Sequence, residues 1–256
     1  MAYWLDQFHV FLLILLRVSA LLVVAPIFGH RLLLARAKIG LAAMVSLVVF
    51  PLVADRAPAV PPGLLVYGVM MVREIAMGLV LGFAVLLLFI GVQFAGQLAG
   101  LQMGFGIINV IDPQSESEVS VIGQFLNILA ILTVLVTDGH HLILRGLFAS
   151  FDVVPLGGAF LRPPLMEKLI ALSAQVFVIA VKISAPILIT LLLISVALGI
   201  LSRTVPQMNV FMVGFPVQVA AGLLVLLVSM PLFQVVLRKA WHLLERDFMS
   251  LVALFA

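Results

Sequence analysis

The stretch ISAPILITLLLISVALGILSRTVPQMNVFMVGFP, residues 183–216, decides what kind of protein this chain forms. Its first part, residues 183–201, is an apolar run without any charge, and it has about the 20-residue length that a helix needs to cross a bilayer. Residues 202–216 then interrupt this pattern with an arginine, two prolines, a glutamine and an asparagine. Polar backbone at membrane depth is tolerated only where protein or water covers it, so we expect function or assembly contacts there.

Composition identifies the chain as an integral membrane protein. Of its 256 residues, 64% are hydrophobic and only 10% are charged, whereas roughly a quarter of a soluble domain is charged. The formal net charge is +3; in a membrane protein such basic residues mainly report topology, so nucleic acid is not an expected partner. The sequence has no cysteine, which excludes disulfides and thiol catalysis.

The apolar segments predict an all-α fold in a single domain over residues 1–256. Prolines and glycines near residues 26–29, 58–63 and 155–164 separate the segments. We expect helices at residues 8–28, 38–54, 64–100, 119–137, 167–202 and 209–237.

Two of these helices are too long for a simple membrane span. At about 1.5 Å per residue, residues 64–100 and 167–202 would each extend about 54 Å, against a hydrocarbon core of about 30 Å. They must tilt steeply, fold back at Pro186 or at the glycines of the first segment, or leave the bilayer within a larger assembly. The acidic loop at 101–118 and the basic pair at 238–239 also do not fit the alternation of a conventional six-span protein.

Several residues within the apolar runs predict close or polar contacts between helices. A charged side chain that faces lipid costs a few kcal/mol, so we expect these residues to face protein or water. We favour an interhelix pair or a subunit contact. The alternative is an ion or substrate path. GxxxG spacings allow helices to approach closely. The charged residues are Arg17, Arg73, Glu74 and Lys182, and the glycine pairs are Gly78 with Gly82 and Gly96 with Gly100.

Known catalytic and metal-binding patterns do not emerge from the sequence. His140 and His141 are adjacent, and adjacent residues do not share a helix face, so we expect no two-histidine metal site. A nucleophile elbow, a dinucleotide-binding loop and a P-loop are also missing. The interpretation is a protein without enzymatic activity, metal or cofactor.

The loop GFGIINVIDPQSESEVS at residues 104–120 is unusual for such an apolar chain. Glycine and Asp-Pro break the helix before an acidic, hydroxyl-rich patch. The residues leave two interpretations open: a solvated connector, or a mobile loop that closes a passage between helices.

The order of several short motifs resembles one family, that of the R subunit of the type III secretion export gate (FliR in flagella, SctT in injectisomes). The resemblance spans nearly the whole chain. In chain order the motifs are Arg17, PIFG at 26–29, Lys38, Glu74 with Gly78 and Gly82, QMG at 102–104, Asp112-Pro113, His140-His141, Pro155, GILSR at 199–203, PQMN at 206–209 and GFP at 214–216.

The resemblance implies a non-enzymatic subunit of the flagellar protein export gate. One such chain would assemble with FliP and FliQ subunits into a helical complex of long, kinked helical hairpins, the channel for unfolded flagellar proteins. Further implied partners are FlhB, FlhA and the proteins at the base of the rod. The implied location is the bacterial inner membrane within the flagellar basal body, with the complex rising toward the periplasm.

The resemblance also implies roles for individual residues. A plug that closes the channel would comprise Gly106, Asn109, Asp112, Pro113, Glu116 and Ser120. Subunit packing would involve Arg17, Glu74, Gly78, Gly82, Lys182, Arg203, Pro206, Gln207, Asn209 and Pro216, with contact to FlhB around Arg203 and residues 207–209.

A secondary transporter for a small solute is the alternative interpretation. Broken helices and buried charges are compatible with it. A repeat between two halves with matched broken helices, which many transporters have, is not evident in the sequence.

Overall fold

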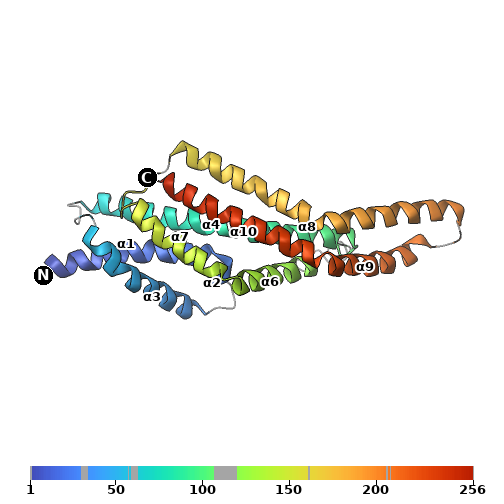
Figure 1. Ribbon diagram of the computed structural model, residues 1–256, viewed down its shortest axis with the longest axis horizontal. Coiled ribbons are helices and arrows are strands. Elements are labelled where there is room, and N and C mark those ends of the chain that lie inside the picture. The colour runs from blue at the N-terminus through green and yellow to red at the C-terminus, as the bar shows by residue number, and fades with distance from the viewer. Residues whose placement is uncertain are drawn as a thin grey trace. The chain divides into compact units, whose positions relative to one another are not determined.

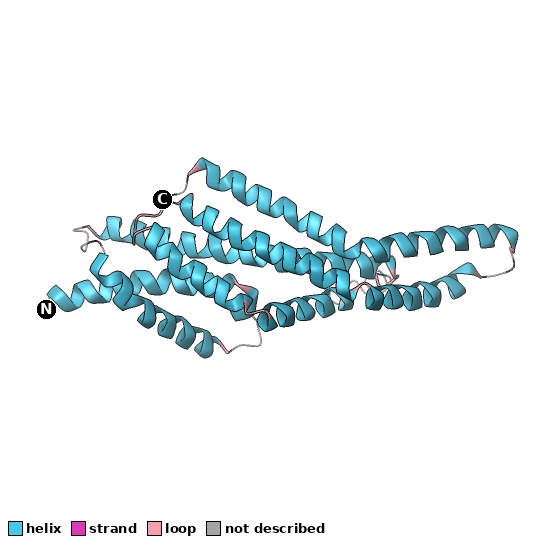
Figure 2. Cartoon of the chain, in the orientation of Figure 1, coloured by secondary structure: helices cyan, strands magenta, loops and turns pink. Residues whose placement is uncertain are grey.

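The regular structure of the chain is entirely helical where it is described (Figure 2). A computed structural model describes residues 2–29, 34–56, 58, 63–106, 120–160, 162–205, 207 and 209–255. The prediction of an all-α membrane protein is therefore confirmed.

The helices follow one another along the chain with short connections (Figure 1). Their bounds are α1 Ala2–Val24, α2 Pro26–Gly29, α3 Ala35–Val53, a 3-10 turn at Ala54–Arg56, α4 Leu64–Gln102, α6 Val121–Val136, α7 Gly139–Val153, α8 Pro163–Thr204, α9 Val210–Val228 and α10 Met230–Ala253. Proline at the first position of α8 suits a helix start, because its missing N–H would have no partner there.

The two overlong segments are confirmed as single helices, α4 of 39 residues and α8 of 42 residues. Pro186 lies inside α8 without ending it, and the glycines of α4 lie within an unbroken helix. Neither helix folds back at these residues. The glycines serve instead as sites of close helix contact.

Two helical regions were not predicted. α7 was missed, and α10 continues to Ala253 beyond the expected end at 237. Both bury only one face, with Ile143, Leu147 and Phe151 on α7 and Leu244 and Phe248 on α10, so neither reads as a continuous apolar run. The predicted helix 209–237 is also divided at Ser229, because Pro231 cannot donate the next helical hydrogen bond.

The chain divides into two compact units. The first comprises Met1–Leu87, Val134–Ser173 and Trp241–Ala256. Within it, α1 packs against α2 and α3 (Figure 1), and the backbone N–H of Phe160 donates to the carbonyl of Phe255 near the C-terminus. Its core includes Leu13, Ile14, Leu21, Met77, Leu81, Leu147 and Phe248.

The second unit comprises Leu88–Thr133 and Ala174–Ala240. Its helices meet at glycines, because a Cβ at Gly96 of α4 would overlap the backbone of Gly123 on α6. A Cβ at Gly91 would lie 3.2 Å from the side chain of Ile179 on α8. This division into compact units does not test whether residues 1–256 form one domain, so that expectation stays a prediction.

Within the described residues, four helices are long and apolar enough to cross a membrane: α1, α3, α4 and α8. The number rises to six if each of two bent helix pairs, α6 with α7 and α9 with α10, forms one span. Length and composition thus agree with a membrane protein.

Candidate functional site

A buried ion pair joins α1 to α4. The Nε of Arg17 lies 2.5 Å from Oε2 of Glu74, and Nη2 of Arg17 lies 3.1 Å from Oε1. Both side chains have 0% exposure. Two parallel N–H···O bonds of this kind match the planar guanidinium to the carboxylate and are stronger than bonds between neutral groups.

The remaining hydrogen-bonding groups of this pair bind the end of α7 and the loop that follows it. Arg17 Nη1 donates to the Ser150 carbonyl at 3.0 Å and to the Ser150 Oγ at 3.2 Å, and Nη2 donates to the Val154 carbonyl at 3.2 Å. Oε1 of Glu74 accepts from the Gly157 backbone N–H at 2.7 Å. The guanidinium also lies 4.3 Å from the centre of the Phe151 ring. One charge pair thereby holds three segments that are distant in sequence.

Arg73, the residue before Glu74, holds the same loop from a second side. Its Nη1 donates to the Gly157 carbonyl at 3.1 Å, and its guanidinium lies 4.4 Å from the centre of the Phe160 ring. Gly157 has a φ of +72° and the Met70 side chain packs against it, so a side chain at this position would be both strained and crowded.

The structure therefore places Arg17 and Glu74 in an interhelix pair inside the chain. Neither side chain has exposed surface in the chain, and the subunit-packing role expected of them stays a prediction. Removing one partner of such a pair typically costs 3–5 kcal/mol, about as much as half the stability of a domain, because the other charge stays buried without compensation.

Gly78 and Gly82 lie beside this pair, where α4 crosses α1. A Cβ on Gly78 would overlap the Arg17 carbonyl, and a Cβ on Gly82 would lie 2.8 Å from the Val24 Cβ. Both glycines are buried within the chain. The close approach that they permit is between these two helices, so this contact, too, is made inside the chain.

The other described residues to which the resemblance assigns subunit packing lie on the surface. Asn209 caps α9, since its side chain accepts a hydrogen bond at 3.3 Å from the N–H of Met212. This accounts for a polar residue at the start of an apolar helix. Pro206 lies outside the described residues, and the exposed ones are Lys182, Arg203, Gln207, Asn209 and Pro216.

Most of the predicted plug lies outside the described residues, namely Asn109, Asp112, Pro113 and Glu116. Its two described ends pack within the second unit. Ser120 Oγ donates to the Gly96 carbonyl at 3.3 Å, and it accepts from the N–H of Gly123 at 3.4 Å, at the start of α6.

The other end of this loop packs on α9. Gly104 has a φ of +93°, and a Cβ there would lie 3.0 Å from the Phe215 ring. Met103 is fully buried, and its side chain fills the space beside Gly222 of α9. Gly106, two residues on, is half-buried. Segment 202–216 thus supplies, through Phe215, the ring on which Gly104 packs.

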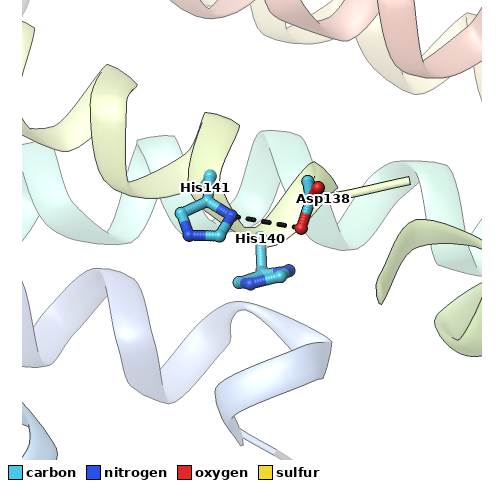
Figure 3. A group of neighbouring side chains, drawn as sticks. All are labelled: Asp138, His140 and His141. Atoms are coloured by element: carbon cyan, nitrogen blue, oxygen red, sulfur yellow. Dashed lines mark ion pairs between the residues drawn. The ribbon is translucent and has the colours of Figure 1, made fainter. Parts of the chain in front are cut away.

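Asp138, His140 and His141 come together at the start of α7 (Figure 3). One potential ligand atom from each lies within 4.8 Å of the other two. Adjacent histidines were predicted to face apart, but the ring centroids of His140 and His141 are only 4.2 Å apart. The spacing Asp-x-His-His at a helix start was the signal that could have indicated this cluster.

These features define an all-α membrane protein in which the ion pair of Arg17 and Glu74 is buried between helices. The sequence model for bacterial export proteins, family 1, matches residues 8–244. The chain is 38% identical over 255 residues to the flagellar biosynthetic protein FliR of Bacillus subtilis (strain 168), covering 97% of this chain and 96% of that protein. It is 32% identical over 230 residues to FliR of Escherichia coli (strain K12), covering 90% and 87%.

The chain therefore belongs to family 1 of the bacterial export proteins, the FliR family. The resemblance found in the sequence is confirmed. Membership of this family, together with the apolar helices, supports a membrane protein with a role in flagellar export.

Proposed function

We propose that the chain is a non-enzymatic subunit of the flagellar type III protein export gate. With FliP and FliQ it forms the channel through which unfolded flagellar proteins pass. The complex lies in the inner membrane and rises toward the periplasm, in contact with FlhB, FlhA and the proteins at the base of the rod.

The apolar surface of α8 and α9 carries this proposal. Only 28% of the residues of the apolar window in α8 are buried, against 61% for α4. Within the second unit the exposed side chains include Phe177, Ile189, Leu193, Val196 and Ile200 on α8 and Met212, Leu224, Leu227 and Val228 on α9. Such a large apolar surface requires either lipid or another protein to cover it.

The length of this surface favours protein over lipid alone. The exposed apolar side chains of α8 run from Met166 to Leu201, about 52 Å along a helix at about 1.5 Å per residue. They would all fit a core of about 30 Å only at a tilt of about 55°, whereas spanning helices tilt by roughly 0–40°. Part of the exposed apolar surface must therefore lie outside the hydrocarbon, where neighbouring subunits such as FliP and FliQ would cover it.

The gating role proposed for residues 106–120 rests on how the ends of this loop are held. Ser120 is bound to α4 through the Gly96 carbonyl, and Gly104 packs on Phe215 of α9. A loop between two fixed ends can close a passage without displacing the helices that carry it.

Copurification tests the proposed assembly. The full chain with an affinity tag is extracted from bacterial membranes that contain the flagellar export apparatus, and the native mass of the complex is measured. We expect FliP and FliQ in the same complex. Leu224→Arg, which places a charge on the exposed apolar face, should remove them, and the control Leu224→Met should retain them.

A chain that purifies alone, and whose Leu224→Arg variant behaves like the Leu224→Met control, would refute the assembly. Movement of a small solute by the isolated chain in proteoliposomes would then favour the secondary transporter instead.

A further inference from the structure

We propose that Asp138, His140 and His141 bind a divalent transition metal ion, with Zn²⁺ as the ion that suits these ligands best. This site is independent of the channel function proposed above. It lies wholly within the first compact unit, and its three side chains are drawn together in Figure 3.

The carboxylate of Asp138 lies beside His141 and does not cap α7. Asp138 has a φ of 56°, the only positive φ among the described non-glycine residues. It occupies the N-cap position of α7, yet its side chain makes no capping hydrogen bond. The carboxylate is thus not engaged with the helix N–H groups, as an N-cap aspartate usually is, and Oδ1 lies 3.5 Å from Nδ1 of His141.

His140 provides the second observation. Its Nδ1 is buried and has no hydrogen-bond partner. Buried polar side-chain atoms nearly always have a partner, and an exception calls for an explanation such as a bound water or ion. The ring of His140 lies 4.2 Å from that of His141, at an angle of 39° between their planes. A metal bound by the edges of both rings would supply the missing partner.

The donor set selects the class of ion. Two imidazoles and one carboxylate suit Zn²⁺ and its neighbours in the first transition row, whereas Ca²⁺ and Mg²⁺ prefer oxygen ligands only. Zn²⁺ commonly takes three protein ligands and one open position, with bonds of about 2.0–2.2 Å. Tetrahedral bonds of this length put ligand atoms about 3.4 Å apart, so the atoms now within 4.8 Å of one another need to close by up to about 1.4 Å. The side chains of Asp138 and His141 are exposed, so a rotation of these side chains can bring their ligand atoms closer.

Space for a fourth ligand lies next to the cluster. Asp138 and His141 line a cavity of about 390 Å³, together with Arg145, His242 and Glu245. Water can reach the metal from this cavity. The charge of Arg145 opposes cation binding, and the carboxylate of Glu245 on the same cavity offsets it.

Metal titration of the full chain tests the site. The chain is purified in detergent with a tag that contains no histidine, stripped with a chelator, and titrated with ZnCl₂ by calorimetry. Metal content is measured after dialysis. We expect one Zn²⁺ per chain, with Mg²⁺ giving no binding. Changes to residues that only hold a metal ligand in place already weaken metal binding by about 10–100-fold. We therefore expect His141→Ala and Asp138→Asn, which remove a ligand, each to weaken Zn²⁺ binding by about tenfold or more.

His242→Ala is the matched control. This histidine lines the same cavity but lies outside the cluster, and its side chain is 76% exposed. His242→Ala should leave the Zn²⁺ affinity within about twofold of that of the parent chain. This change is smaller than the least loss expected for a metal-site residue. His140→Ala could disturb folding, because Nδ1 is buried, so the exposed Asp138 and His141 carry the test.

Three results would overturn the proposal: no stoichiometric Zn²⁺ binding by the parent chain, unchanged affinity in both His141→Ala and Asp138→Asn, or an equal loss in His242→Ala.

Discussion

Glu74 lies between Arg17 and the backbone of Gly157, with Oε2 2.5 Å from the Nε of Arg17 and Oε1 2.7 Å from the N–H of Gly157. Because both charged side chains are fully buried, this contact fixes how the loop after α7 packs on α1 and α4. Pairing also offsets the free-energy cost that either charge alone would have within the membrane.

Breaking this pair from one side should destabilise the chain severely. We expect Arg17→Ala and Glu74→Ala each to lower the free energy of unfolding by about 3 kcal/mol or more, because the remaining charge would be buried alone. The double variant Arg17→Met/Glu74→Leu should lose much less. Thermal unfolding in detergent measures the effect. Arg56→Ala is the control, since Arg56 pairs with Asp152 at an exposed site; equal stability of Arg17→Ala and Arg56→Ala would contradict the prediction.

Replacing a glycine at a helix contact by alanine should change stability differently from replacing a glycine on an open helix face. A Cβ on Gly96 would overlap Gly123, whereas one on Gly199 of α8 would have no heavy atom within 4 Å. Gly96→Ala should therefore destabilise the chain by roughly 1–3 kcal/mol, while Gly199→Ala should stabilise it by about 0.5–1 kcal/mol. Thermal unfolding of the two variants compares them, and a loss in Gly199→Ala as large as that in Gly96→Ala would argue against the observed packing of α4 on α6.

Arg203 should matter for assembly rather than for the fold of the chain. It is exposed in the last turn of α8, and we expect Arg203→Ala to abolish complex formation, as measured by the native mass of the purified complex. Arg238→Ala, at another exposed position to which we assign no packing role, serves as the control. An intact complex that no longer exports would instead favour a direct role of Arg203 in transport.

Deleting residues 110–118 should leave the channel open. We expect cells that carry this deletion to become permeable to ions or small molecules, because the proposed plug would be missing from the channel. Uptake of a small dye by these cells, compared with cells carrying the parent chain at the same level, measures the leak. An unchanged uptake would remove the gating role from this loop.

Asn209 should act locally, as a helix cap. Replacing it by alanine removes the acceptor for the Met212 N–H and should cost about 1 kcal/mol of helix stability. Asn209→Ser keeps an acceptor and should restore most of this loss. Thermal unfolding separates the two, and an equal loss in both variants would mean that the side chain acts through another contact.

Helices that form one continuous apolar run could be predicted from the sequence, whereas helices that bury only one face could not. The long helices α4 and α8 follow from continuous apolar sequence and were predicted. α7 was not, since it buries one face only and carries polar residues such as His141 and Arg145 on its exposed side. Pro231, which separates α9 from α10, was overlooked because the apolar run continues past it.

By itself, the sequence determined that this chain is a helical membrane protein of the FliR family, because composition, segment length and the order of short motifs are local properties of the chain. Only the tertiary structure decided that Arg17 pairs with Glu74, 57 residues away, and that Asp138 meets both His140 and His141. Such pairs depend on how helices pack and on one unusual backbone angle, and neither leaves a periodic signal in the sequence.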